Sequence, residues 1–277
     1  FGPLLRSVIA SAGNDHRLGA NEAPPAILSV YLGDQLENVF QNIKDGKINE
    51  AAEDGEMDLG LDQILNFKRD PGDRNRTSPF AFTGNRFEFR AVGSAQSVSG
   101  PLVAMNTMLA DSLYWIADKL EFELGKGTEQ GAAVVHVLKE LMEEHGNAVF
   151  CCDVYSAYWH TKAFEERGLN NIPTTADSLP ALMQEDVKEL FRSTGVLSQI
   201  ELESRYEVYS EQYINSIMVE AKLVVDMAKT LIYPAATRYL SDLTLANASM
   251  VEMGIEADPA VALRLRAVPK RPQGIHA

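Results

Sequence analysis

Four arginines and one glutamate lie between residues 74 and 90, and these residue types could bind a phosphate group. They are Arg74, Arg76, Arg86, Glu88 and Arg90. From Arg86 onward, charged and aromatic residues alternate with the period of two that is typical of a strand. We therefore predict a hairpin whose last strand turns its charged residues to one face and its phenylalanines to the other. Such a charged face is either an ordinary ion-pair cluster or a phosphate site.

A second polar segment precedes the arginines in the chain. It contains Arg17 and Glu22 and passes through two prolines into the apolar run from residue 27 to residue 32. Loops carried by rigid elements often hold functional residues. Two motifs are R-L-G-A-N-E-A-P-P, which begins at Arg17, and N-R-T-S-P-F, which begins at Asn75. Together they resemble the active-site region of glutamine synthetase, and their exact residues resemble those of the type III branch.

The resemblance implies a role for each matched residue. It implies that Glu88 is a ligand of a catalytic divalent ion and that Arg86 contacts nucleotide phosphates. Arg17 and Arg90 would bind the substrate glutamate, and Arg76 would stabilise the transferring phosphoryl group. Glu22 would lie on a mobile loop that closes the site and helps to take a proton from ammonium. A carboxylate suits Mg²⁺ or Mn²⁺, and the planar guanidinium suits phosphate oxygens. Where the shorter branch of the family has a second phosphate arginine, this chain has Ala81.

The implied reaction has two steps. ATP phosphorylates the side-chain carboxylate of glutamate, and ammonia then displaces phosphate to give glutamine. A closing loop protects the γ-glutamyl phosphate from water, and arginines positioned beside the phosphoryl oxygens supply the catalysis. Two alternatives remain open: a ligase that joins glutamate to a larger amine such as a polyamine, and a noncatalytic interaction protein that keeps the fold.

The resemblance also implies an α+β fold in three parts. Residues 1–125 correspond to the C-terminal part of a glutamine synthetase-type catalytic domain, an antiparallel sheet with helices, and carry an insertion at about 33–72. Residues 126–255 form a mostly α-helical C-terminal extension, and residues 256–277 a loose tail. Within the insertion, apolar residues from Leu36 to Ile43 recur at helical spacing, and the acidic stretch that follows is expected to be solvated.

Helical patterns dominate the second half of the chain. We expect a packing helix from Gly100, a second helix from Thr128, a third over 177–191 and a long one from about Ser198 to residue 243. Pro234 should kink or end the last of these. Its apolar stripe, which includes several tyrosines, fits either an oligomer interface or an intramolecular bundle.

Composition excludes some classes of function. A net charge of −14 over 277 residues argues against a nucleic-acid surface, and the chain has no apolar run long enough for a membrane span. Cys151 and Cys152 are adjacent, which is poor geometry for a disulfide, so we expect reduced thiols and a cytoplasmic protein.

The resemblance covers only the last part of the catalytic domain and the extension beyond it. In the family, most metal-binding glutamates and the metal histidine precede the position that matches Phe1. Because Glu88 cannot hold two ions by itself, we expect the 277 residues alone to bind metal weakly and not to turn over. The active form is expected to be a longer subunit in a homo-oligomer of stacked rings, similar to a dodecamer.

Overall fold

The structure is a computed structural model that describes residues 1–20, 23–46, 56–57, 67–68, 78–150, 157–256 and 259–260. The chain forms two compact units, Phe1–Tyr213 and Ile214–Ala277. Glu22, Arg74, Arg76 and the two cysteines lie outside the described residues, as do most of the acidic stretch and of the predicted tail.

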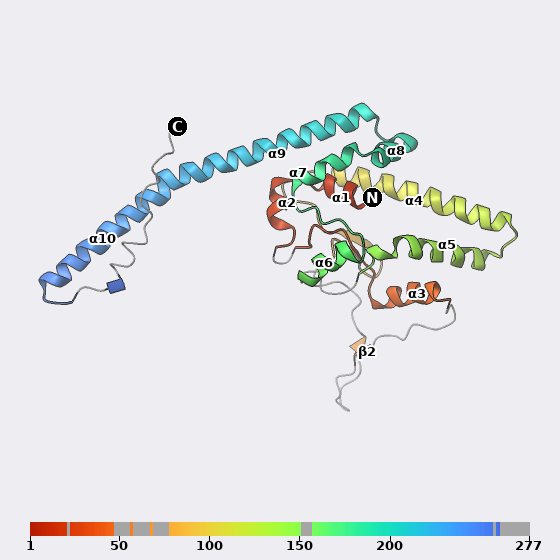
Figure 1. The fold of residues 1–277 in the computed structure, drawn as a ribbon, viewed down its shortest axis with the longest axis horizontal. Coiled ribbons are helices and arrows are strands. Elements are labelled where there is room, and N and C mark those ends of the chain that lie inside the picture. Colours follow the sequence, from red (N-terminus) through yellow and green to blue (C-terminus); the bar gives the residue numbers. More distant parts are fainter. Residues whose placement is uncertain are drawn as a thin grey trace. The chain divides into compact units, whose positions relative to one another are not determined.

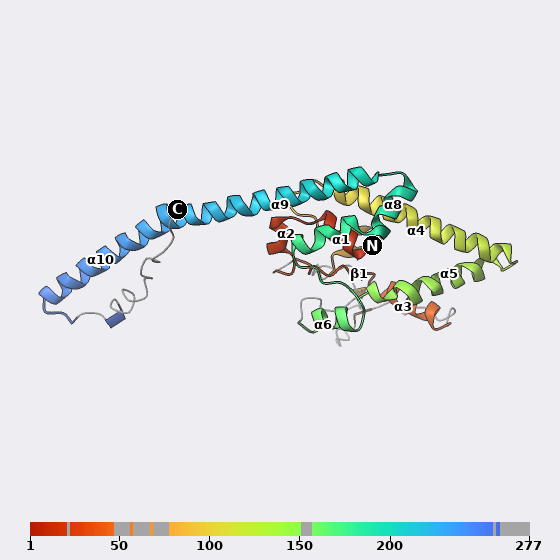
Figure 2. The ribbon, with the colours of Figure 1, turned by 45° about the horizontal axis from the view of Figure 1, so that its top comes forward.

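The first unit is mostly helical. Its helices are α1 (Gly2–Val8), α2 (Ala12–Arg17), α3 (Asp34–Lys44), α4 (Ser99–Gly125), α5 (Gln130–His145), η1 (Gly146–Ala148), α6 (Ala157–Glu165), α7 (Thr175–Ser178), η2 (Leu179–Met183), α8 (Glu185–Thr194) and the start of α9 (Gln199–Met227). Helix α5 packs between α4 and α3, so these three lie side by side in the ribbon (Figure 1, Figure 2).

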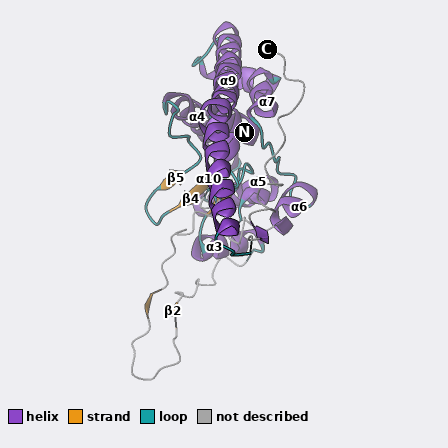
Figure 3. Cartoon of the chain, turned by 90° about the vertical axis from the view of Figure 1, so that its left-hand side faces the viewer, coloured by secondary structure: helices purple, strands orange, loops and turns teal. Residues whose placement is uncertain are grey.

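A small sheet joins three short strands in the order β1 (Val30–Tyr31), β4 (Phe80–Phe82) and β5 (Phe87–Phe89). Strands β4 and β5 form the predicted antiparallel hairpin (Figure 3). The prediction of a wholly antiparallel sheet is wrong, however, because β1 pairs with β4 in parallel. More than forty residues separate these two strands in the sequence, which is room enough for the crossover that a parallel pair requires. Within that insertion, β2 (Glu56–Met57) pairs with β3 (Phe67–Lys68).

The helix boundaries follow local signals in the sequence. Helix α4 has Pro101 in its first turn, as predicted, and α5 begins after Glu129, whose side chain accepts the N–H of Ala132. The single helix predicted over 177–191 is wrong. It is divided into α7, η2 and α8, because Pro180 starts a 3₁₀ turn and Gln184 is extended.

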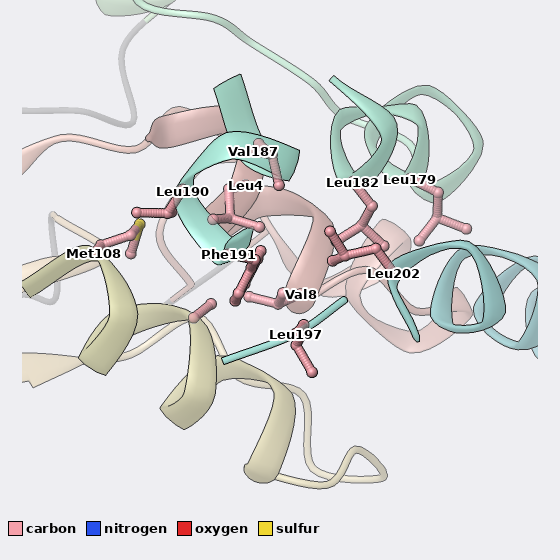
Figure 4. Close-up of a cluster of buried hydrophobic side chains, with 11 residues drawn as sticks. Leu4, Val8, Met108, Leu179, Leu182, Val187, Leu190, Phe191, Leu197 and Leu202 are labelled. Carbon is pink, nitrogen blue, oxygen red and sulfur yellow. The ribbon is translucent and has the colours of Figure 1, made fainter. Parts of the chain in front are cut away.

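The main core joins elements that are far apart in the sequence. Figure 4 shows its apolar side chains converging from α1, α4, η2, α8 and the start of α9. Its members are Leu4, Val8, Ala104, Met108, Leu179, Leu182, Val187, Leu190, Phe191, Leu197 and Leu202. Residues from both predicted domains therefore share this core.

The packing helix predicted from Gly100 corresponds to α4, whose apolar residues are only partly buried. Met108 lies in the core, but Leu109 and Leu113 are 57% and 55% exposed. Apolar residues occur on several sides of this helix, and within the first unit α1, α5 and α8 do not cover all of them.

The second unit contains the rest of α9, a π turn at η3 (Ala228–Ile232) and α10 (Tyr233–Glu252). Pro234 does not end the helical path. The π turn directly before it accommodates the missing N–H and the proline ring, as such turns do in other helices. Many apolar side chains of this unit are exposed, among them Val224 and Ile232. None of the described helices is long and apolar enough to cross a membrane.

Candidate functional site

The hairpin separates charged from aromatic residues as the alternation predicts. The rings of Phe80 and Phe87 stack with centroids 5.2 Å apart. The ring of Phe82 lies 5.3 Å from that of Phe87, and the ring of Phe89 lies 6.0 Å from that of Phe80. The opposite face of β5 carries the ionic residues. A four-residue turn closes the hairpin, in which Thr83 donates its N–H to the carbonyl of Arg86 and Gly84 adopts a φ of 94°, which favours glycine.

Glu88 lies at the centre of an ion triplet. Arg86 Nη2 is 3.4 Å from Glu88 Oε1, whereas Arg90 Nε and Nη2 are each 3.2 Å from Glu88 Oε2. The two arginines differ in exposure: 72% of the Arg86 side chain is accessible but only 15% of that of Arg90. Arg90 is thus held in place, while Arg86 reaches into solvent from the same carboxylate.

Ala81 lies directly opposite Glu88 across the β4–β5 pair. Opposed residues of an antiparallel pair share a face of the sheet, so the position where the shorter branch of the family carries an arginine adjoins the ion triplet. In this chain Ala81 is completely buried. The triplet therefore uses the cations that directly precede and follow β5, and receives none from β4.

Arg17 is joined to the chain that follows β5. Its Nη2 donates to the carbonyl of Arg90 at 2.8 Å. Its Nη1 donates to the Asn14 side chain at 3.1 Å and to the carbonyls of Ala91 and Val92 at 3.3 Å each. A guanidinium has five N–H donors, and among the described residues the Nε–H of Arg17 has no recorded partner. Arg17 and Arg90, the two arginines to which the resemblance gives the same substrate, are thus brought together.

The polar residues directly before Arg17 belong to helix α2, whereas their composition predicts a loop. The Ser11 side chain accepts the N–H of Asn14 and so caps α2. Asn14 is completely buried and donates to the carbonyls of Ile9 and Ala91 at 2.7 and 2.9 Å. Sequence analysis assigned Asn14 no role, and the serine cap three residues before it was the available signal. His16, by contrast, is exposed.

Asp15 forms a second group of contacts that sequence analysis missed. Its carboxylate accepts the N–H and the hydroxyl of Thr175 at 3.1 and 2.8 Å, and lies 3.3 Å from Nη2 of the buried Arg6. Burial lowers the pKa of the Arg6 guanidinium, and Asp15 acts in the opposite direction. Burial also raises the pKa of Tyr213, with a further contribution from the charge of Asp15 and a hydrogen bond to it.

A metal would find one suitable ligand in this part of the site. Among the described residues no group of three or more His, Cys, Asp or Glu side chains could hold an ion. Glu88 lies beside the two arginines, and its carboxylate oxygens are of the hard type that Mg²⁺ and Mn²⁺ prefer. Glu22 and Arg76, outside the described residues, have no described position relative to it.

Comparison with known proteins gives the class of the chain. Residues 133–251 match the family model of the glutamine synthetase C-terminal domain. The chain is 44% identical over 232 residues to the type-3 glutamine synthetase of Dictyostelium discoideum, covering 84% of this chain and 31% of that protein. It is 37% identical over 240 residues to a glutamine synthetase of Bacteroides fragilis, covering 85% and 33%. The match to a glutamine synthetase of Butyrivibrio fibrisolvens is 36% over 244 residues, covering 88% and 34%.

The chain therefore belongs to the glutamine synthetase family. Its relative from Dictyostelium is a type-3 protein, which agrees with the branch that the Arg17 and Asn75 motifs predict. The chain spans about a third of the length of these curated relatives.

Proposed function

We propose that this chain acts within a longer subunit that ligates ammonia to glutamate with ATP through a γ-glutamyl phosphate. One observation carries the proposal: in a chain of this family, Arg17 is bonded to the carbonyl of Arg90, whose side chain is paired with Glu88 beside Arg86. Two cations and one carboxylate thus meet at the end of the hairpin, and a third cation, Arg17, is bonded to the main chain that directly follows it. This is the charge arrangement that transfer of a phosphoryl group to a carboxylate requires.

Arg17 and Arg90, the two less exposed arginines, suit the substrate glutamate. Arg90 is held by Glu88, and Arg17 is held by main-chain carbonyls that occupy its Nη1. The N–H groups of Arg17 that the main chain does not engage would bind the substrate carboxylate. In this proposal the two guanidiniums fix the amino acid, so that its side chain meets ATP in one orientation.

The exposed arginine suits the nucleotide. Arg86 extends into solvent from the outer side of Glu88 and is weakly restrained there, because an ion pair in water contributes little. Its charge is therefore available for ATP phosphates. Arg76 would stabilise the transferring group, and Glu22 would close the site and accept a proton from ammonium, as the resemblance implies.

Mg²⁺ or Mn²⁺ would be held partly by Glu88. The ion would neutralise phosphate charge when bound, and its other ligands would come from the remainder of the longer subunit. We further propose a cytoplasmic homo-oligomer of stacked rings, with the 277 residues inactive alone. The length of the curated relatives supports the need for a longer subunit.

The choice of amine tests this function against its first rival. We expect the natural long subunit, supplied with ATP, Mg²⁺ and glutamate, to make glutamine from ammonium at least about tenfold faster than it forms γ-glutamyl amides from polyamines, since such a ratio corresponds to ~1.4 kcal/mol of transition-state discrimination. Product analysis by mass spectrometry measures both. Faster turnover with polyamines would favour the glutamate–amine ligase, and absence of either product would favour the noncatalytic protein.

A further inference from the structure

Helix α2 carries Arg17, and contacts on two sides set its position. A helix of six residues is not stable by itself in water, so its orientation depends on what its side chains contact. On one side, Asn14 and Arg17 bond to the main chain at residues 90–92. On the other, Asp15 accepts two hydrogen bonds from Thr175 of the helical extension.

The contacts of Asp15 are close and largely buried. Thr175, at the start of α7, is 1% exposed and donates both its N–H and its hydroxyl to the carboxylate. Arg6, also 1% exposed, supplies the compensating charge. Arg6 is itself fixed by the carbonyls of Ile172 and Pro173 at 2.7 and 3.0 Å. The segment from residue 172 to residue 175 therefore fixes Asp15 directly through Thr175 and indirectly through Arg6.

A continuous series of contacts thus runs from the extension to the candidate site. It passes from Thr175 to Asp15, along two residues of α2 to Arg17, and from Arg17 to the carbonyl of Arg90. Thr175 lies within residues 133–251, which match the glutamine synthetase C-terminal domain. That region contributes none of the site residues predicted from the sequence.

We propose that Thr175 of the helical extension is a positioning residue for Arg17, one of the glutamate-binding arginines, and acts through Asp15 on α2. This inference rests on the proposed function. The Thr175 hydroxyl donates to the Asp15 carboxylate at 2.8 Å, and Asp15 lies two residues before Arg17 on the same short helix. Loss of this hydroxyl loosens α2 and hence Arg17. Arg86, which contacts Glu88 at the outer edge of the hairpin, lies beyond the end of this series.

The test removes one hydroxyl group in the natural long subunit. Thr175→Val removes the hydroxyl and keeps the shape of the side chain. Because hydrogen bonds to charged groups are stronger than neutral ones, we expect this variant to raise the KM for glutamate roughly fivefold, with the KM for ATP changed less than about twofold. Thr175→Ser, which retains the hydroxyl, should keep the wild-type KM for glutamate.

A matched control separates positioning from general stability. Thr107→Val removes a buried hydroxyl that bonds within α4. It should lower Tm as much as Thr175→Val does, without raising the KM for glutamate. The shift of Tm on adding glutamate, and separately ATP, gives a second readout that needs no turnover.

Two results would overturn the inference. One is an unchanged KM for glutamate in an active Thr175→Val variant, and the other is an equal change in Thr175→Ser and Thr175→Val. If Thr175→Val fails to fold, Thr175→Ala is compared with Thr175→Ser in the same way. A wild-type subunit without ammonia-dependent turnover would instead contradict the proposed function, and with it this inference.

Discussion

Glu88 is shared unequally by its two neighbours. Arg90 makes two contacts with one oxygen and is largely shielded, whereas Arg86 makes one contact and is mostly exposed. Exposed ion pairs stabilise a fold by about 0–1 kcal/mol, and so the triplet is a weak explanation for stability. Its value lies in holding three charges on one face of a strand.

Replacing Glu88 by glutamine separates these two roles. The amide keeps the size of the side chain but removes the charge that would bind a divalent ion. We expect Glu88→Gln to reduce glutamine synthesis by the long subunit at least about a hundredfold, equivalent to roughly 2.7 kcal/mol of transition-state stabilisation. Stability should fall by no more than about 1 kcal/mol, as measured by chemical denaturation.

Asn85→Ala is the matched control, since it changes an exposed polar residue in the turn of the same hairpin. It should leave synthesis close to the wild-type rate. A Glu88→Gln variant that retained normal activity would remove Glu88 from the metal site. A large loss of stability without loss of activity would return the triplet to the ordinary ion-pair interpretation.

At the scale of elements, local patterns predicted some features well. Alternation of charged residues and aromatic rings predicted the faces of β5, Gly100 and Pro101 predicted the start of α4, and Thr128 that of α5, both within two residues. The Arg17 side chain donates to the main-chain carbonyl of Arg90, and the shared substrate that the resemblance gives these two arginines stays a prediction. These features depend on neighbours in the sequence or on motifs long enough to be specific.

Other features depend on contacts that no local pattern contains. The parallel pairing of β1 with β4 needs a crossover, and the burial of Asp15 beside Thr175 joins residues 160 positions apart. Several apolar side chains of α4 are exposed although the sequence predicts a packing helix. Helical spacing indicates a helix but does not say how many of its sides are covered. The helix predicted over 177–191 is divided at Pro180. The prediction followed the helical spacing of the apolar residues and gave this proline too little weight.

The start of α9 gives a pH-dependent prediction. Glu201 accepts the N–H and the hydroxyl of Ser198, both at 2.8 Å, and these bonds, the one to the N–H first, hold its pKa below the usual value of 4.5. A carboxylate whose pKa is lower in the folded state stabilises the fold above the pKa of the unfolded state, and this contribution is lost as pH falls through the folded pKa.

We therefore expect Glu201→Gln to lower the Tm of the 277-residue chain at neutral pH and to have progressively less effect as pH falls below 4.5. Thermal unfolding followed by circular dichroism, with wild type and variant compared at each pH, measures this difference. Glu207→Gln, an exposed change further along the helix, should show no such trend. A difference in Tm that did not change with pH would show that the hydrogen bonds do not depend on the charge of Glu201.

At the scale of the molecule, the candidate site and the main core belong to one compact unit. All the buried apolar residues of the described chain lie between Leu4 and Leu202, and so does every described residue to which a role in the site is assigned. The extension contributes to this unit through α7, η2 and α8, which pack on α1 and α4. The helical region is therefore part of the structure that carries the site, which explains how it could position Arg17.

The measurement that tests the central claim most directly is phosphate release from ATP with Mg²⁺ and glutamate, with and without ammonia. It is made on the longest natural form of the subunit and on the 277-residue chain in parallel. We expect ammonia-dependent release by the long form and none by the 277 residues, because Glu88 supplies only part of the metal site. Ammonia-dependent release by the 277 residues would contradict the division of the site between this chain and the remainder of the subunit, and no release by either form would contradict the ligase itself.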